Sequence, residues 1–110
     1  MKFEWDPEKA EINLRKHDVS FEEAMTVFKD PLAFIFDDEE HSQEEHREII
    51  IGTSALSRIV LICFVERVEN TIRIFSARRA TKNEIKDYEK NARKQTRQSC
   101  GNVHRIQIQL

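Results

Sequence analysis

Two segments near the start of the chain have the apolar spacing and the start signals of helices. Asp6 followed by Pro7 predicts a helix over residues 7–16, because the carboxylate accepts a first-turn N–H and proline loses nothing at the first helical position. A capping box at Ser20–Glu23 opens a second helix with apolar residues at i, i+3, i+4 and i+7, and this helix ends before Pro31. We expect the two helices to form a hairpin.

Strand patterns fill the middle of the chain. Residues 46–52, 58–65 and 71–76 have the composition of strands, and residues 32–36 are a candidate for a short fourth one. The segments that join the three main strands are short, which favours antiparallel pairing, since a parallel pair needs a long crossover. The run 59–65 is apolar on both faces, which indicates a central strand.

The rest of the chain completes an α+β domain. A capping box at Thr81–Glu84 opens a last helix that runs to about Gln98. We therefore predict one domain over residues 1–97, with a small antiparallel sheet of three to four strands and a C-terminal helix. Residues 98–110 form a tail whose alternating apolar and polar end suits either an edge strand or an extended segment.

Composition and charge limit the classes of function. The chain has 110 residues, 39% apolar and 35% charged, which indicates one compact domain with a highly charged surface. Residues 1–48 carry a net charge of −9 and residues 49–110 carry +7. This division suggests a basic surface for a polyanion and an acidic surface for a basic partner, unless the charges mix in three dimensions. With no signal peptide, membrane span or disulfide pattern evident, we expect a cytoplasmic location.

Candidate chemistry comes from cations near the first helix and near the last strand. Cleaving RNA without a metal needs groups that move protons and fixed cations that stabilise the charge building on phosphorus. Candidates for these roles are Lys9, Asn13, Lys16, His17, Glu66, Arg67, Arg73, Arg78 and Arg79. Structural alternatives stand beside each role: a solvated helix face, a histidine bonded to helix-end carbonyls, a hairpin turn at Glu66, and a core position for Trp5, the sole tryptophan.

The acidic stretch 37–45 holds six carboxylates in nine residues and raises the question of a metal. His41 lies within it and His46 directly follows it. The spacing lacks the glycine-containing pattern of a calcium loop, so we interpret the stretch as a solvated loop. We predict no metal and no cofactor.

Several spaced blocks, in one order, resemble the BrnT family, the toxins of type II toxin–antitoxin systems, over roughly residues 3–90. The blocks are Phe3-Glu4-Trp5-Asp6-Pro7, Lys9-Ala10, Asn13-Leu14, Lys16-His17, Val19 to Ala24, Phe28, Asp30-Pro31, Asp38, Arg47, Ile51-Gly52, Glu66-Arg67, Arg73-Ile74, Ser76 to Ala80, Glu84 and Tyr88. The resemblance implies a RelE-like fold and a ribonuclease that inhibits growth. It also implies a ribbon-helix-helix antitoxin of the BrnA type, which neutralises the toxin and through which alone the toxin is bound to operator DNA. It further implies functional roles for Trp5, Lys9, His17, Glu66, Arg67, Arg78 and Arg79.

These observations lead to one main hypothesis, a metal-independent endoribonuclease toxin. We predict catalytic roles for Lys9, His17, Glu66, Arg67, Arg78 and Arg79, and RNA contacts from Trp5, Asn13, Lys16 and Arg73. The hypothesis requires that the first helix and the end of the last strand bring their cations into a common pocket. The alternatives are a non-catalytic nucleic-acid-binding module or co-repressor, and an interaction protein whose acidic half binds a basic partner.

Overall fold

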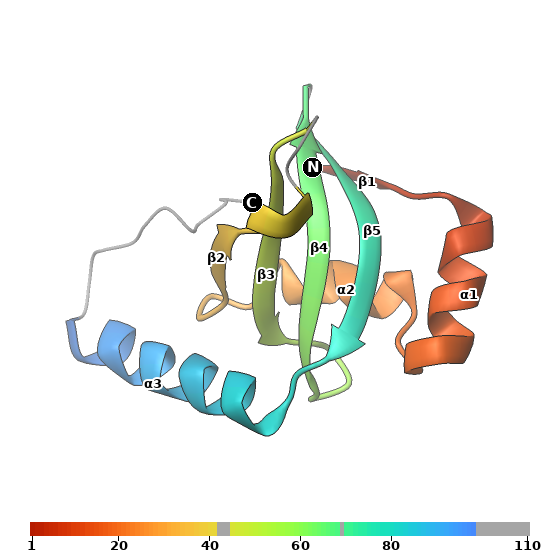
Figure 1. The fold of residues 1–110 in the computed structure, drawn as a ribbon. Helices are drawn as coiled ribbons and strands as arrows, with labels where there is room; N and C mark the ends of the chain where they lie inside the picture. The colour runs from red at the N-terminus through yellow and green to blue at the C-terminus, as the bar shows by residue number, and fades with distance from the viewer. Residues whose placement is uncertain (42–44, 69, 99–110) are drawn as a thin grey trace.

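A five-stranded mixed sheet with three helices makes up the protein, in a computed structural model that describes residues 1–41, 45–68 and 70–98 (Figure 1). The elements in chain order are β1 (Lys2–Glu4), α1 (Pro7–His17), α2 (Phe21–Val27), β2 (Phe34–Asp37), a 3-10 turn η1 (Glu39–His41), β3 (Arg47–Thr53), β4 (Ile59–Arg67), β5 (Thr71–Arg79) and α3 (Lys82–Gln98). The strand order is β1-β5-β4-β3-β2. The α+β class is confirmed.

The sheet differs from the prediction in strand number and direction. It has five strands rather than three to four, because residues 2–4 form an additional strand at one edge. This strand, β1, runs parallel to β5, with Lys2 opposite Thr71, whereas the other neighbours are antiparallel. The long excursion through α1 to β4 lets two strands far apart in the chain pair in parallel. The central position predicted for residues 59–65 is confirmed, since β4 is the middle strand.

The first two helices begin where their caps predict. Asp6 accepts a hydrogen bond from the Glu8 N–H at 2.9 Å, and Ser20 accepts one from the Glu23 N–H at 2.9 Å. The main contacts of α1 are with β5, while α2 packs on β3, β4 and β5. Each helix is therefore positioned by the sheet, and the predicted hairpin layout is not confirmed.

The main core fills the space between α2 and one face of the sheet. The buried members come from α2, the segments flanking it and the three central strands: Val19, Phe21, Ala24, Val27, Phe28, Ala33, Ile50, Val60, Ile62, Phe64, Ile72, Ile74 and Ala77. A second, smaller cluster lies on the opposite face, where Tyr88 of α3 packs with Ile51 and Leu61. The Tyr88 hydroxyl donates to Asp30, between α2 and β2, and accepts from Thr53 of β3, and these bonds fix α3 against the sheet.

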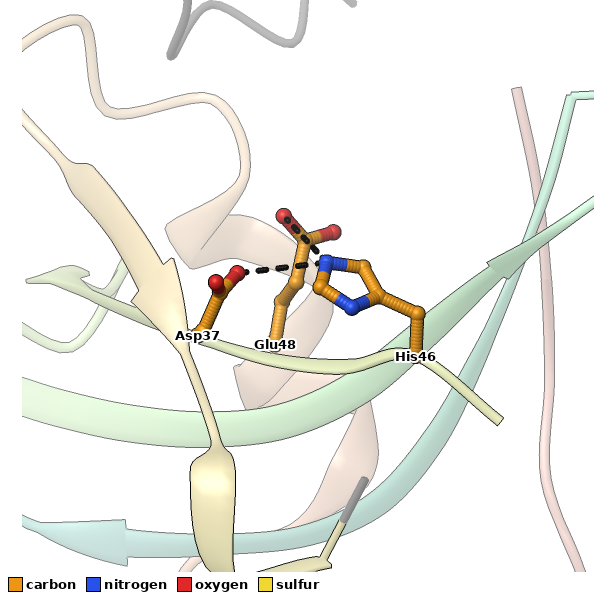
Figure 2. A group of neighbouring side chains, drawn as sticks. All are labelled: Asp37, His46 and Glu48. Atoms are coloured by element: carbon orange, nitrogen blue, oxygen red, sulfur yellow. Dashed lines mark ion pairs between the residues drawn. The ribbon is translucent and has the colours of Figure 1, made fainter. Parts of the chain in front are cut away.

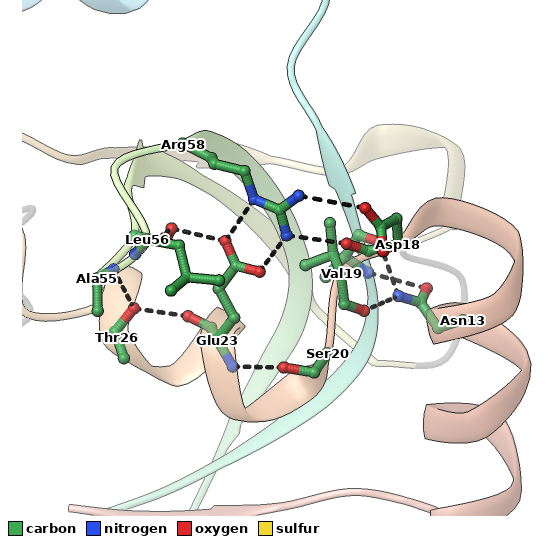
Figure 3. Close-up of polar contacts among 11 residues, drawn as sticks. Asn13, Asp18, Val19, Ser20, Glu23, Thr26, Ala55, Leu56 and Arg58 are labelled. Atoms are coloured by element: carbon green, nitrogen blue, oxygen red, sulfur yellow. Dashed lines mark hydrogen bonds and ion pairs between the residues drawn. The ribbon is translucent and has the colours of Figure 1, made fainter.

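An ion-pair network joins α2 to the strands and to the end of α1 (Figure 3). The Arg58 guanidinium binds the buried carboxylate of Glu23 and also donates to the Asp18 carbonyl at 2.8 Å. Ser54 donates to the same Glu23 carboxylate at 2.6 Å. The Arg58 guanidinium holds the pKa of Glu23 below its usual value, so this carboxylate is charged and part of the framework.

The predicted tail, residues 98–110, lies outside the described residues except for Gln98, which ends α3. No helix within the described ranges is long and apolar enough to cross a membrane.

Candidate functional site

One face of the sheet, turned away from α2, carries four arginines. Side chains alternate along a strand, so residues paired across strands share a face. Val65 is opposite both Arg47 and Arg73. Leu61, Val65 and Arg67 are an even number of residues apart on β4, so their side chains lie on one face. Arg78 is opposite Leu61 and therefore lies on this face too. We call Arg47, Arg67, Arg73 and Arg78 the arginine face.

A β-bulge adds an aromatic ring to this face. The pairing shifts between Cys63, which is opposite Ser76, and Phe64, which is opposite Ile74, so Phe75 is the extra residue on β5. The guanidinium carbon of Arg47 lies 3.9 Å from the centroid of the Phe75 ring, a cation–π contact. A stacked arginine and aromatic ring offer a flat surface of the kind on which unpaired bases stack.

Carboxylates hold two of these arginines near the start of β5. Arg73 lies 3.2 Å from the carboxylate of Glu4 on β1. Arg67 binds Glu45 at 2.9 Å and approaches Glu4 at 3.7 Å. These side chains are partly exposed, so the pairs are weak and can exchange for another anion such as a phosphate.

Arg78 is held at the other end of the sheet by Glu84, in the first turn of α3. Two parallel hydrogen bonds of 2.9 Å join the guanidinium to the carboxylate, and Glu84 also accepts from the Thr81 N–H at 2.8 Å. The Arg78 hydrogen bonds lower the pKa of Glu84 to about 2. The predicted capping box therefore exists, and it fixes Arg78 as well.

The topology does not bring all the predicted catalytic cations to one phosphate. Arg67 lies six residues along β4 from the residue paired with Arg78, which corresponds to about 20 Å at strand rise. Arg79 points to the opposite face from Arg78, and its charge helps to lower the pKa of Glu23 on the α2 side. The single four-cation pocket predicted from the sequence is therefore wrong, because neighbouring strand residues alternate and the strands are long.

The α1 residues have different surroundings. Asn13 is buried, and its amide donates to the carbonyls of Val19 and Ala77 and accepts from the Ala77 N–H, so its role here is to join α1 to β5. Lys9 is an exposed residue one turn earlier on α1. Within the described ranges, neither Lys9 nor Lys16 has an ion-pair partner.

Trp5 packs edge-to-face on Phe21, with 5.7 Å between ring centroids, and is partly buried against the main core. This is the core position that the sequence left as the alternative to a stacking surface for RNA.

The two candidates for proton transfer lie at opposite ends of the molecule. His17 ends α1, next to Asp18, whose carbonyl binds Arg58 just before β4. Glu66, on β4, follows Arg58 by eight residues, which corresponds to about 26 Å between these two residues at strand rise. The sequence offered His17 or Glu66 for the same pocket. Only Glu66 neighbours Arg67 along β4, and its side chain starts on the opposite face of the sheet.

A surface hollow of about 560 Å³ lies where β4 ends and β3 begins, lined by Glu45, His46, Glu48, Val65, Glu66, Arg67 and Val68. In it, His46 Nε2 lies 3.2 Å from an Asp37 carboxylate oxygen and 4.0 Å from one of Glu48 (Figure 2). The three side chains each bring one polar atom within 4.8 Å of the others. An ion pair between a histidine and two carboxylates accounts for this arrangement, and we assign no metal to it.

A thiol reaction is not supported on this face. Cys63 lies 3.2 Å from the buried carboxylate of Asp38, and burial together with that carboxylate raises the pKa of the thiol to about 12. The nucleophilic thiolate is therefore scarce at neutral pH.

Sequence reasoning missed Arg47, Phe75 and His46 as site residues. Arg47 had a detectable signal, since it alternates with Ile49 and Ile51 on the same strand. The position of Phe75 depends on the bulge, which has no local signal in the sequence.

A small α+β domain with arginines, carboxylates and an aromatic ring on one sheet face has the features of a protein that binds a polyanion. Residues 5–84 match the family model described as the ribonuclease toxin BrnT of type II toxin–antitoxin systems. The chain belongs to the BrnT family.

The structure is similar to the crystal structure of the Brucella abortus ribonuclease toxin, BrnT, with a TM-score of 0.58 and 26% sequence identity. The match covers 74% of this chain and 99% of that one. A comparison with curated proteins found no match.

Proposed function

We propose that this protein is an endoribonuclease toxin that cleaves RNA without a metal ion and thereby inhibits growth. The observation that carries the proposal is the arginine face, with Arg67 also lining the hollow that includes Glu66. Fixed guanidinium groups stabilise the charge that develops on phosphorus during cleavage. Glu66 precedes Arg67 on β4 and is paired with Ile72 on the opposite face, so the two side chains can meet only around the end of the strand, where both line this hollow. Glu66 is the predicted proton-transfer residue there.

When RNA binds, its phosphates replace carboxylates as the ion-pair partners of the arginines. Arg67 loses a partly exposed ion pair with Glu45 and Arg73 loses one with Glu4, and each gains an ion pair with a phosphate. This exchange changes the free energy of the protein's own ion pairs little, because such exposed pairs are weak. The release of counterions from the RNA makes binding favourable overall. The stacked pair of Arg47 and Phe75 offers a surface for an unpaired base, which favours single-stranded RNA.

Three other predicted cations, Lys9, Lys16 and Arg78, lie away from the hollow and are candidates for contacts with more distant parts of the bound RNA. Lys9 and Lys16 are exposed cations on α1, beside β5, and Arg78 lies at the far end of the arginine face. We propose that they bind neighbouring phosphates rather than the scissile one. His17, Arg79 and Trp5 stay predictions without a distinct step in this scheme.

Family membership supports a specific partner. A type II toxin has a protein antitoxin, and we propose one of the BrnA type, a ribbon-helix-helix protein that neutralises the toxin and carries it to operator DNA. Covering the arginine face is the simplest means of neutralisation, because this removes the phosphate contacts.

Incubation of the purified chain with single-stranded RNA in EDTA tests the proposal. The parent and a Lys29→Ala control, which removes an exposed cation beyond α2, should cleave the RNA at the same rate. An Arg67→Ala/Arg73→Ala variant should be slower by about 100-fold, since each cation is a transition-state contact.

Two outcomes contradict the proposal. Intact RNA with the parent, together with tight and salt-sensitive binding, would favour the non-catalytic nucleic-acid-binding module. Equal cleavage by all three proteins would remove the arginine face from the mechanism.

A further inference from the structure

We propose that His46 and Glu66 are the acid–base pair of the ribonuclease reaction, with His46 as general acid, Glu66 as general base and Arg67 as the phosphate contact. This assignment rests on the proposed function. It replaces His17, which lies at the other end of β4, with a histidine that lines the same hollow as Glu66 and Arg67.

The register of the sheet supports the pairing. Arg47 and Val65 are the last pair of the β3–β4 ladder, and His46 and Glu66 are the next residue on either side of that pair. Both side chains line the hollow at this end of the sheet. We infer that two proton-transfer groups in one hollow can reach the two oxygens on either side of one phosphorus atom.

Carboxylates hold the histidine ring in one orientation. His46 Nε2 lies 3.2 Å from Asp37 and 4.0 Å from Glu48, and Asp37 is directly opposite Glu48 across β2 and β3 (Figure 2). Like charges directly opposite one another are unfavourable in a sheet unless a cation lies between them. His46 lies beside both carboxylates, so the pairing of β2 with β3 sets the position of the ring.

The arrangement leaves one ring nitrogen for the substrate. Nε2 is the ring nitrogen close to Asp37, and within the described ranges Nδ1 has no protein partner. A histidine ring held in place by neighbouring carboxylates, with one nitrogen facing the substrate, has the arrangement of a general acid. Asp37 and Glu48 are positioning residues, since they act through His46.

The reaction balances with these groups alone. The Glu66 carboxylate takes the proton of the 2'-hydroxyl, and O2' forms a bond to phosphorus. The bond from phosphorus to O5' breaks, and His46 Nδ1 gives its proton to O5'. The products are a 2',3'-cyclic phosphate and a 5'-hydroxyl end, with one proton gained by Glu66 and one lost by His46. Arg67, with donors beyond the one bonded to Glu45, stabilises the charge on the non-bridging oxygens.

Two substitutions and two substrates test the assignment. His46→Gln and Glu66→Gln should each slow cleavage of ordinary RNA in EDTA by about 100-fold or more, with Glu22→Gln, an exposed glutamate on α2, as the matched control. On an RNA in which sulfur replaces the 5' leaving oxygen, a thiolate departs without a proton. His46→Gln should then approach the parent rate, whereas Glu66→Gln should stay slow.

This selective rescue separates an acid from a residue that only maintains the fold, which would be impaired on both substrates. Thermal unfolding of each variant provides a second check, because both side chains are exposed and should leave the melting temperature unchanged.

Failure of the assignment and failure of the proposed function have different signatures. A parent that leaves RNA intact refutes both. A parent that cleaves RNA while His46→Gln and Glu66→Gln retain full activity refutes only the acid–base pair. Loss of activity in His17→Gln but not in His46→Gln would return the proton transfer to α1, and cleavage that stops in EDTA and returns with added Mn²⁺ would make the histidine cluster a metal site instead.

Discussion

Removing the carboxylate of Glu23 should destabilise the protein by about 3 kcal/mol. The Glu23 side chain is 4% exposed, and it accepts hydrogen bonds from Arg58 at Nε, 3.0 Å, and from Ser54 at 2.6 Å. Breaking a buried ion pair by removing one partner costs about 3–5 kcal/mol, because the other charge stays without compensation. Arg58 keeps its bonds to Asp18, so we expect the lower end of this range.

That loss is a large fraction of the total. A domain of this length has a free energy of unfolding of about 11 kcal/mol at roughly 0.1 kcal/mol per residue. A loss of about 3 kcal/mol lowers the melting temperature by about 12 °C, and it lowers the urea midpoint by about 2 M at a slope of roughly 1.5 kcal/mol/M.

Urea denaturation of Glu23→Ala, followed by circular dichroism, measures the effect. Glu22→Ala is the control, since this neighbouring glutamate is exposed on the same helix. If the two variants unfold within 0.5 kcal/mol of each other, a difference no larger than ordinary surface substitutions give, the network does not stabilise the fold as described.

Three further predictions concern stability. Asn13→Ala should cost about 3 kcal/mol by calorimetry, since it leaves three buried backbone groups unpaired, and a normal melting temperature would contradict the bonds described. Glu84 has its pKa lowered to about 2 by Arg78, so its stabilisation is complete above its usual pKa and is lost as the pH falls toward 2. Unfolding free energies between pH 5 and 2.5 should therefore fall more steeply for the parent than for Glu84→Gln; parallel curves would count against this coupling. Gly52→Ala should destabilise by about 1–3 kcal/mol in urea, because the new Cβ meets the Ala33 Cβ at 2.8 Å; unchanged stability would mean that the neighbour moves freely.

Helix starts and the central strand were predictable because their signals are local. The caps at Asp6 and Ser20 use hydrogen bonds within three residues, and the apolar run in β4 is readable without knowing its neighbours. The edge strand β1 was not predictable in the same way. It is three residues long, and its partner Thr71 is far away in the chain.

The grouping of site residues failed for a related reason. Arg78 and Arg79 are adjacent in sequence, and on a strand this places their side chains on opposite faces. Arg47, Arg67 and Arg73 are dispersed in sequence, and only the register of three strands shows that they share a face. The acidic loop was interpreted as solvated, yet pairing of β2 with β3 brings its first carboxylate, Asp37, to His46.

The parallel pairing of β1 with β5 has a consequence for the order of events during synthesis. Lys2 meets Thr71 only after almost 70 further residues have been made, which takes roughly 4 to 14 s at 5–20 residues per second. Until then Glu4 has no Arg73 to bind, and α1 has no β5 edge on which to pack. The nascent chain thus carries its N-terminal segment undocked for seconds, an interval in which a partner that binds this segment would meet the toxin before it can act.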